Sequence, residues 1–282
     1  MTGQSVYRAY RGIFGAARPA ALDGVALPPA PMPARRGRRP IKAWRYVGVF
    51  GPEVMICAAI VRIGPARQSF WAVWDRASGR LQEHTALGRG DVGMAPGRVD
   101  IDGHGVRLHL TLDEGAGIET VSPSGAAYAW TRKQGGTAAT GTLAIEGGRA
   151  RAFAARAVID DTAAYYPRHT RWWWSAGVGQ ARDGRAVAWN LVDGVNDDDA
   201  ASERTVWIDG EATEVGPVRF APGLGAVGAL RFHPEAERAR SENLLLVRSR
   251  YRQPFGTFDG ELPGGVGLAA GYGVMEDHDV YW

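Results

Sequence analysis

The chain has 282 residues, of which 45% are hydrophobic and 22% are charged, the balance of a folded globular protein. Its formal net charge is only +3, which is too weak a positive balance to indicate a nucleic-acid partner. Glycine (39 residues) and tryptophan (10 residues) are both abundant, which favours many turns that join aromatic-rich strands.

The N-terminus and the single cysteine indicate where the protein resides. Met1–Ser5 lacks the charged-then-apolar layout of a secretion signal. Cys57 is the only cysteine, so no intrachain disulfide can form and a reducing compartment is expected. The apolar run Val54–Val61 around it is too short to span a bilayer. We therefore expect a cytoplasmic protein in which Cys57 is a small buried hydrophobe.

Positive charge is concentrated in a basic arm, residues 35–42, directly after a proline-rich run at residues 28–33. One interpretation is a solvated connecting arm. The other is a weak contact with an anionic membrane surface, which attracts polybasic segments. The oligomeric state cannot be read from the sequence.

The first half of the chain predicts short strands separated by turns. Trp44–Phe50 and Val54–Ile63 are the first two of them. The dipeptide Asp102-Gly103 predicts a tight hairpin turn. Tyr128–Lys133 and Thr137–Ile145 predict two strands that pair across a glycine-containing turn.

The second half continues in the same way, with one exception. Pro234–Asn243 predicts a short helix, because proline is favoured in the first turn of a helix. Regular strands with little helix predict an all-β, antiparallel sandwich or barrel. The strands are too many for one closed barrel, so we expect two barrel-like halves. The loop Asp160–Pro167 is the predicted junction between domains 1–160 and 161–282.

Three consecutive tryptophans, Trp172, Trp173 and Trp174, form the most informative segment. In a strand, Trp172 and Trp174 share one face while Trp173 points the other way. Two indoles on one face make a flat apolar wall, and each buried N–H needs an acceptor. With His169 and Arg171 at its rim, such a wall suits a large, mostly neutral, hydrophobic ligand. The alternative is that these rings simply fill a barrel core.

Five segments resemble signatures of the family catalogued as domain of unknown function 2804. They are Trp44–Glu53, Phe70–Arg76, His169–Gly177, Tyr251–Gly256 and Gly271–His278. The resemblance covers almost the whole chain. It implies no function, because the family itself is uncharacterised.

More remotely, the pattern is similar to tandem lipocalin-like proteins, which include carotenoid 1,2-hydratases, tocopherol cyclase and fungal cyclisation enzymes of the Diels–Alderase type. This similarity implies two lipocalin-like antiparallel β-barrels packed side by side. In the hydratases, a His followed by Trp, then Tyr and Asp, manages protonation of an isoprenoid double bond. Here His169 with Trp172 and Trp174 would match the first part, and Asp193 or Asp197 would match the acid. The spacing differs, and the expected Tyr before the acid is missing.

The residues around that acid have a rationale of their own. Asn190, Asp193, Asn196 and Asp197 crowd one turn-rich segment. A carboxyl at a strand end beside an aromatic cavity is a candidate general acid, because desolvation raises its pKa. Nearby indole faces would stabilise a cation formed by protonation. The alternative is an Asx-rich loop that bonds to its own backbone.

Further polar residues are candidates for binding the ligand. Tyr251, Arg252 and Gln253 combine a phenol, a guanidinium and an amide that can donate hydrogen bonds to a ligand carbonyl or carboxylate. The alternative is a conformational lock at a barrel corner. Tyr166, at the predicted junction, would plug the cavity.

Metal and cofactor chemistry receive no support from the sequence. The six histidines are scattered, no His/Cys spacing matches a zinc site, and His104 and His109 are interpreted as turn and strand residues. No glycine-rich loop fits a phosphate site, so we expect no cofactor. Glu276 and His278 form an acid–base pair on one strand face, which we expect to be exposed near the C-terminus.

Two functions remain open. The first is a cofactor-independent cyclase, hydratase or isomerase that acts by acid catalysis on a large hydrophobic, isoprenoid-like molecule, with His169, Asp193 and Asp197 as catalytic residues. The second is a non-catalytic carrier of a lipophilic ligand, in which the polar groups only orient the guest.

Overall fold

The computed structural model describes residues 7–244 and 247–282, and Met1–Ser5, on which the expected lack of a secretion signal rests, lies outside them. Strands dominate this part of the chain and no α-helix occurs in it; the helical segments are short 3-10 turns, η1 (Ala20–Leu22) and η2 (Pro222–Leu224). None of its helices is long and apolar enough to cross a bilayer. The predicted all-β fold with little helix is confirmed.

The first half of the chain forms one antiparallel sheet of eleven strands. Their order is β7 (Arg80–Leu87), β6 (Ala66–Asp75), β5 (Val54–Ile63), β4 (Lys42–Phe50), β13 (Arg151–Ala164), β12 (Ala127–Ile145), β10 (Val106–Leu112), β9 (Arg98–Gly103) and β8 (Val92–Ala95). On a side branch, β11 (Ile118–Ser124) pairs with β12 and with β1 (Tyr10–Ile13). The end strands β7 and β8 are consecutive in the chain, and the short link between them requires the sheet to curl back on itself.

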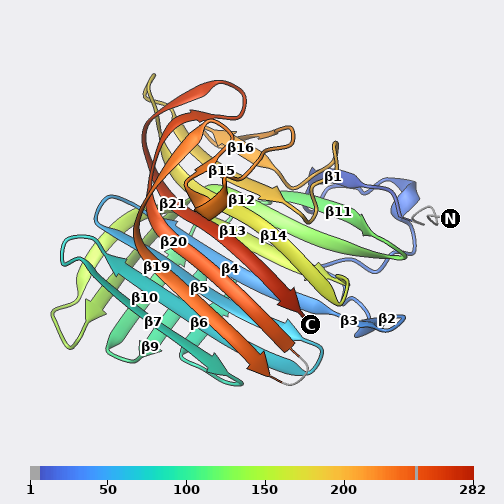
Figure 1. The fold of residues 1–282 in the computed structure, drawn as a ribbon, viewed down its shortest axis with the longest axis horizontal. Helices are drawn as coiled ribbons and strands as arrows, with labels where there is room; N and C mark the ends of the chain where they lie inside the picture. The colour runs from blue at the N-terminus through green and yellow to red at the C-terminus, as the bar shows by residue number, and fades with distance from the viewer. Residues whose placement is uncertain (1–6, 245–246) are drawn as a thin grey trace.

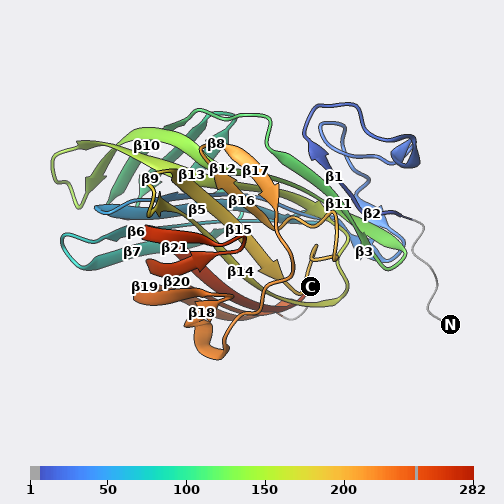
Figure 2. The ribbon, with the colours of Figure 1, turned by 90° about the horizontal axis from the view of Figure 1, so that it is seen from above.

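The second half forms an antiparallel sheet of eight strands. Their order is β17 (Glu211–Glu214), β16 (Thr205–Ile208), β15 (Ala186–Asp193), β14 (His169–Ala181), β21 (Val266–Tyr281), β20 (Val247–Leu262), β19 (Leu230–Leu244) and β18 (Ala226–Val227). A separate small hairpin pairs β2 (Arg35–Arg36) with β3 (Arg39–Pro40). Figure 1 shows β19, β20 and β21 lying over the first sheet, and Figure 2 shows the two sheets from above as stacked layers.

Alternation of side chains along each strand divides the interior into separate apolar clusters. In β4, Val47 packs inside the curl of the first sheet, whereas Tyr46 points into a cluster that the two sheets share. In β14, Trp172 and Trp174 join the shared cluster, whereas Trp173 packs on the second sheet's own cluster. The predicted separation of Trp173 from its two neighbours is therefore confirmed.

The helix predicted at Pro234–Asn243 is wrong. This segment lies in β19, which pairs with β20 along its length, with a register shift between Pro234 and Ala236. Proline has no N–H to donate to a ladder and is tolerated at such irregularities. Pairing with β20 therefore overrides the local helical propensity.

The hairpin predicted from Tyr128–Lys133 and Thr137–Ile145 is also wrong, because both segments belong to the single strand β12. A bulge between Gly135 and Thr137 interrupts its pairing with β13. Gly136 there has a φ of +75°, a conformation that side chains disfavour. The glycines thus mark a bulge inside a strand. The predicted hairpin does join β9 and β10, but its two-residue turn is His104-Gly105, because Asp102 and Gly103 still pair with β10.

The chain changes from the first sheet to the second between Ala164 and His169. The two sheets share one apolar cluster, and the division into domains 1–160 and 161–282 stays a prediction. In the described strands, the hydrogen-bonded order of each sheet has two ends, β7 and β8 in the first and β17 and β18 in the second.

The basic arm is partly fastened to the first sheet. Arg39 Nη1 donates hydrogen bonds to the carbonyl oxygens of Ser124 (2.7 Å) and Tyr165 (3.0 Å). Lys42 is buried, and its Nζ donates to the carbonyl oxygen of Tyr166 (2.8 Å). Contact of the arm with a membrane surface stays a prediction.

Gly135 is where the packing of the two sheets is least tolerant of a larger side chain. A Cβ at Gly135 would lie 2.3 Å from the ring of Trp207 on β16. We expect Gly135→Ala to lower the free energy of unfolding by about 1–3 kcal/mol, measured by urea denaturation, because the ring must move. The control is Gly216→Ala, where a Cβ would meet nothing within 4 Å; equal effects of the two substitutions would contradict this packing.

Candidate functional site

A cavity of about 140 Å³ lies between the two sheets. Its walls come from β4, β5, β6, β12 and β13 of the first sheet and from β14, β15, β19, β20 and β21 of the second. An apolar cavity of about 150 Å³ in another protein is known to take up benzene. The space therefore has room for a guest about the size of one ring without rearrangement.

Aromatic side chains form much of the cavity wall. The rings of Trp44 and Trp172 are stacked, with centroids 6.2 Å apart and planes 7° apart. Trp282 continues the stack beyond Trp172 at 6.3 Å. Trp174 meets the ring of Tyr46 edge to face at 5.2 Å. The two sheets thus face each other through flat apolar surfaces.

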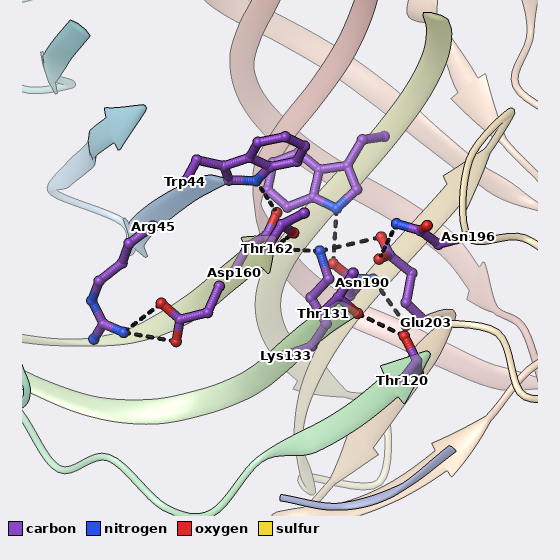
Figure 3. A network of polar contacts seen from close by, with 12 residues as sticks. Trp44, Arg45, Thr120, Thr131, Lys133, Asp160, Thr162, Asn190, Asn196 and Glu203 are labelled. Carbon is purple, nitrogen blue, oxygen red and sulfur yellow. Dashed lines mark hydrogen bonds and ion pairs between the residues drawn. The ribbon is translucent and has the colours of Figure 1, made fainter. Parts of the chain in front are cut away.

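One side of the cavity holds a buried ionic network, shown in Figure 3. Lys133 Nζ lies 2.6 Å from an oxygen of Asp160 and 3.2 Å from an oxygen of Glu203. Asp160 also accepts hydrogen bonds from Trp44 Nε1 (3.0 Å) and Thr162 Oγ1 (2.8 Å). The carboxylates of Asp160 and Glu203 therefore both contact the ammonium group of Lys133.

Amide side chains extend this network toward the aromatic wall. Asn196 Nδ2 donates to the Tyr166 hydroxyl (2.6 Å) and to Glu203 (3.0 Å). Trp174 Nε1 donates to Asn190 Oδ1 (2.8 Å), and Asn190 Nδ2 in turn donates to the carbonyl oxygen of Glu203 (3.0 Å). These bonds hold Tyr166 and Trp174 in place.

The pKa values of this network indicate a fixed charge. Burial acts to lower the pKa of Lys133, but Asp160 and Glu203 outweigh it and raise that pKa, so the lysine stays protonated. Burial raises the pKa of Glu203, and Lys133 opposes that shift. The network is a paired structural element rather than a free acid.

A second polar group, on the side of the second sheet, centres on Glu276. Its two oxygens accept hydrogen bonds from Trp172 Nε1 (2.8 Å) and Gln253 Nε2 (2.9 Å), and both donors are neutral. The residue is 7% exposed. Burial raises the pKa of Glu276 to about 7, although its contacts with Trp172, Tyr251 and Gln253 act to lower it. Near neutral pH the protonated acid and the carboxylate are both present.

Several polar atoms close to Glu276 lack partners. The Tyr46 hydroxyl and Gln253 Oε1 are buried and have no hydrogen-bond partner in the described part of the chain. The buried Tyr251 hydroxyl makes no hydrogen bond of normal geometry there, but it lies close enough to Glu276 to lower the pKa of that carboxyl. Both tyrosines line the cavity. Unpaired buried polar groups are costly, so they are available to a polar group of a ligand.

His278 lies beside Glu276 on the same face of β21. Burial and the nearby Arg238 lower the pKa of His278 to about 3, so its imidazole is neutral at ordinary pH. One ring nitrogen lies 2.8 Å from the hydroxyl of Ser249. The ring packs on Trp172 with centroids 4.3 Å apart. His278 therefore adds shape and no charge to this wall.

Of the predicted ligand-binding residues, most lie at the cavity. Those that line it are Tyr166, Trp172, Trp174, Asn196 and Tyr251. Asn190 and Gln253 are buried behind the wall and hold Trp174 and Glu276, respectively.

The predicted catalytic residues do not line the cavity. His169 is exposed and pairs with Asp279 (2.8 Å). Asp193 lies opposite Trp173, on the face of β15 that points away from the cavity. Asp197 accepts a hydrogen bond from the backbone N–H of Gly194 (2.7 Å), as the alternative of an Asx-rich loop implies.

Arg252, predicted to bind the ligand, is also outside the cavity. It is exposed and pairs with Glu237 (2.7 Å). Period-two alternation explains this outcome, because Arg252 must face opposite to Tyr251 and Gln253. The same rule separates His169 from Trp172 and Trp174.

The buried ionic network and the carboxyl with the raised pKa were not predicted from the sequence. Glu276 and His278 were expected to be exposed, but Glu276 is buried and His278 is half-buried, and both line the cavity. Lys133, Asp160 and Glu203 come from three segments far apart in the sequence, and no local pattern marks them. The only available signal was the i, i+2 spacing of Glu276 and His278, which places both on one strand face.

The raised pKa of Glu276 predicts a pH dependence of stability. As pH rises from 4.5, the ordinary pKa of glutamate, to about 7, the folded state keeps a proton that the unfolded state has lost. The free energy of unfolding therefore falls over this window. Across this window we expect wild-type protein to lose up to about 3 kcal/mol relative to Glu276→Gln, which cannot ionise. Urea unfolding of both proteins at about pH 5 and about pH 8 measures this difference; a constant difference would show that Glu276 is not perturbed.

Comparisons with known proteins address the fold and the family. No curated protein proved similar in sequence. Kievitone hydratase from Nectria haematococca superposes with a TM-score of 0.53 at 11% identity, over 84% of this chain and 88% of that chain. A Nitrosomonas europaea protein assigned the name AttH superposes with a TM-score of 0.47 at 15% sequence identity, over 90% of this chain and 97% of that chain. CghA in complex with Sch210972 superposes with a TM-score of 0.45 at 11% sequence identity, over 86% of this chain and 88% of that chain. At these identities, the likeness to kievitone hydratase shows a shared fold alone.

The family follows from the sequence itself. The model of the family described as "Domain of unknown function (DUF2804)" matches residues 91–282, more than half of the chain. The segments His169–Gly177, Tyr251–Gly256 and Gly271–His278, which resemble that family, lie inside the matched range. The chain therefore belongs to the DUF2804 family.

Proposed function

We propose that this protein is a cofactor-independent acid catalyst, a hydratase, cyclase or isomerase, for an apolar small molecule held between the two sheets. The observation that supports this proposal is a single carboxyl, Glu276, with a pKa of about 7 in a wall of tryptophans. A general acid works best when its pKa lies near the working pH.

The proposed chemistry needs no reactant other than the substrate and, for hydration, water. Glu276 donates its proton to a double bond and becomes a carboxylate, and the positive charge appears on the substrate. In an isomerisation, a neighbouring C–H bond then breaks and its proton returns to Glu276. In a cyclisation, a second double bond of the substrate first attacks the cation and closes the ring, and the new cation then loses a neighbouring C–H proton to Glu276. In a hydration, water adds to the cation and loses its proton to the same carboxylate. Either way the enzyme is regenerated.

The residues around Glu276 suit each stage of this reaction. The indole face of Trp172 would stabilise the cationic intermediate. The hydroxyl of Tyr46, which has no hydrogen-bond partner among the described residues, and the hydroxyl of Tyr251 beside Glu276 would orient a carbonyl or hydroxyl of the substrate. His278 stays neutral and so does not repel the cation. Kievitone hydratase, whose name denotes a hydration, shares the fold and supports this class of reaction.

The alternative is a carrier of the same kind of molecule. It is favoured by the cavity's largely aromatic wall and by the Lys133 network, which is fully paired and orients no free group toward a reaction. In a carrier, Glu276 would only bind a polar end of the guest. The two functions differ in whether the bound molecule leaves chemically changed.

The effect of Glu276→Gln separates these functions. Purified protein is incubated with an apolar extract of the expression host, and bound and released species are compared by mass spectrometry. We expect wild-type protein to yield an isomer or a hydrated product, and Glu276→Gln to retain the ligand with a turnover reduced by at least about 10²-fold. The control is Asp279→Asn, on the outer face of the same strand, which should behave as wild type. Recovery of unchanged ligand from wild-type protein would establish the carrier.

The pH profile of turnover gives an independent check once a substrate is known. Because the protonated form of Glu276 is the active one, turnover should fall as pH rises through about 7. A rate that rises over the same window would indicate a general base and contradict the proposed role.

A further inference from the structure

Three metal-binding side chains meet at the edge of the first sheet, and none of them lines the cavity. His84 lies on β7, Asp91 precedes β8, and His104 lies in the turn between β9 and β10. Asp91 Oδ2 is 3.0 Å from His84 Nδ1 and 3.5 Å from His104 Nε2. Both imidazoles thus aim at one carboxylate oxygen, and their rings stack with centroids 3.5 Å apart.

The spacing of these atoms matches a coordination sphere. One ligand atom from each residue lies within 4.8 Å of the others. In a tetrahedral zinc site with bonds of about 2.0–2.1 Å, ligand atoms are about 3.3 Å apart. The two nitrogen–oxygen distances of 3.0 and 3.5 Å lie on either side of that value. A metal ion could be bound once the stacked rings turn so that both nitrogens point at it.

Other histidine–aspartate pairs in the chain lack this convergence. His109 pairs with Asp100 (2.8 Å) and His169 with Asp279 (2.8 Å), each with one imidazole. Within residues 7–244 and 247–282, the three-residue group at His84 is the one whose ligand atoms converge. A second imidazole on the same oxygen distinguishes it from an ordinary surface ion pair.

The backbone is shaped to hold Asp91 in this position. A Cβ at Gly103 would lie 2.6 Å from the carboxyl carbon of Asp91, so glycine leaves the space that the carboxylate fills. The backbone N–H of Asp102 also donates to the carbonyl oxygen of Asp91 (3.2 Å). His104 has a φ of +52°, the left-handed conformation that tight hairpin turns require.

We propose that His84, Asp91 and His104 bind a divalent transition metal ion, of which Zn²⁺ is the best match, with solvent completing the coordination. Two nitrogens and one carboxylate oxygen suit zinc. The side chains are 29%, 23% and 53% exposed, so solvent can reach the ion. No zinc-binding spacing links these residues along the chain, which is why the sequence predicts no metal.

The site lies where it would join two edges of one sheet. β7 and β8 end the hydrogen-bonded order of the first sheet, and β9 follows β8. A metal ion held by His84 on one side and by Asp91 and His104 on the other would cross-link this seam. Binding should therefore stabilise the curled sheet by mass action.

The test uses the full chain without a histidine tag, cleared with EDTA and titrated with Zn²⁺ in a calorimeter. We expect one Zn²⁺ per chain and a thermal midpoint that rises with Zn²⁺ concentration. His104→Asn and Asp91→Asn should weaken binding at least tenfold, by analogy with the roughly 10–100-fold effect of indirect ligand contacts. Asparagine tolerates the positive φ at position 104, so this variant should fold.

Two further variants make the result specific. Gly103→Ala should weaken Zn²⁺ binding without removing a ligand, because it displaces the Asp91 carboxylate. His109→Ala, which removes an exposed histidine of a simple pair, should bind Zn²⁺ as wild type does. The proposal is overturned if wild-type protein takes up no Zn²⁺, or if His104→Asn retains the wild-type affinity.

Discussion

Period-two alternation along the strands that line the shared cavity is the constraint on which this structure depends. Most of these strands turn one face to the cluster of their own sheet and the other to the cluster between the sheets. The face of the strand on which a residue lies therefore decides whether its side chain meets the cavity. Glu276 and His278 meet it, whereas Asp277 and Asp279, between and beside them, pair with Arg171 and His169 outside.

The two buried polar groups of the cavity differ because their partners differ in charge. Asp160 and Glu203 face the ammonium of Lys133, and an ion pair can offset part of the cost of burying charge. Glu276 receives only neutral donors, from Trp172 and Gln253. Without a cation, a buried carboxyl lowers its free energy by taking up a proton. The Lys133 network is therefore a paired, charged element, whereas Glu276 takes up a proton near neutral pH.

The sequence predicted what depends on local pattern. Alternation and turn residues identified the strands, and the three tryptophans were assigned correctly to two faces. The bulge at Gly135 was mistaken for a hairpin, because glycine pairs serve both features. The helix predicted at Pro234 failed because pairing with β20 is a long-range contact.

The candidate site was harder to predict, for the same reason. Strand alternation places His169 on the face opposite to Trp172 and Trp174, and Arg252 on the face opposite to Tyr251. Both residues were nevertheless predicted to lie at the site, because they are close in sequence to residues that line it. The bond from Trp172 to Glu276 joins residues 104 positions apart, and its existence depends on the register between β14 and β21. His84, Asp91 and His104 likewise meet only through the curl of the first sheet.

The proposed acid chemistry depends most directly on the protonation of one carboxyl between the sheets. Infrared difference spectra of wild-type protein against Glu276→Gln, recorded over a pH series, isolate the C=O stretch of that acid. A raised pKa of Glu276 predicts a band that disappears with a midpoint near pH 7. A midpoint near the ordinary glutamate pKa of 4.5 would contradict this prediction.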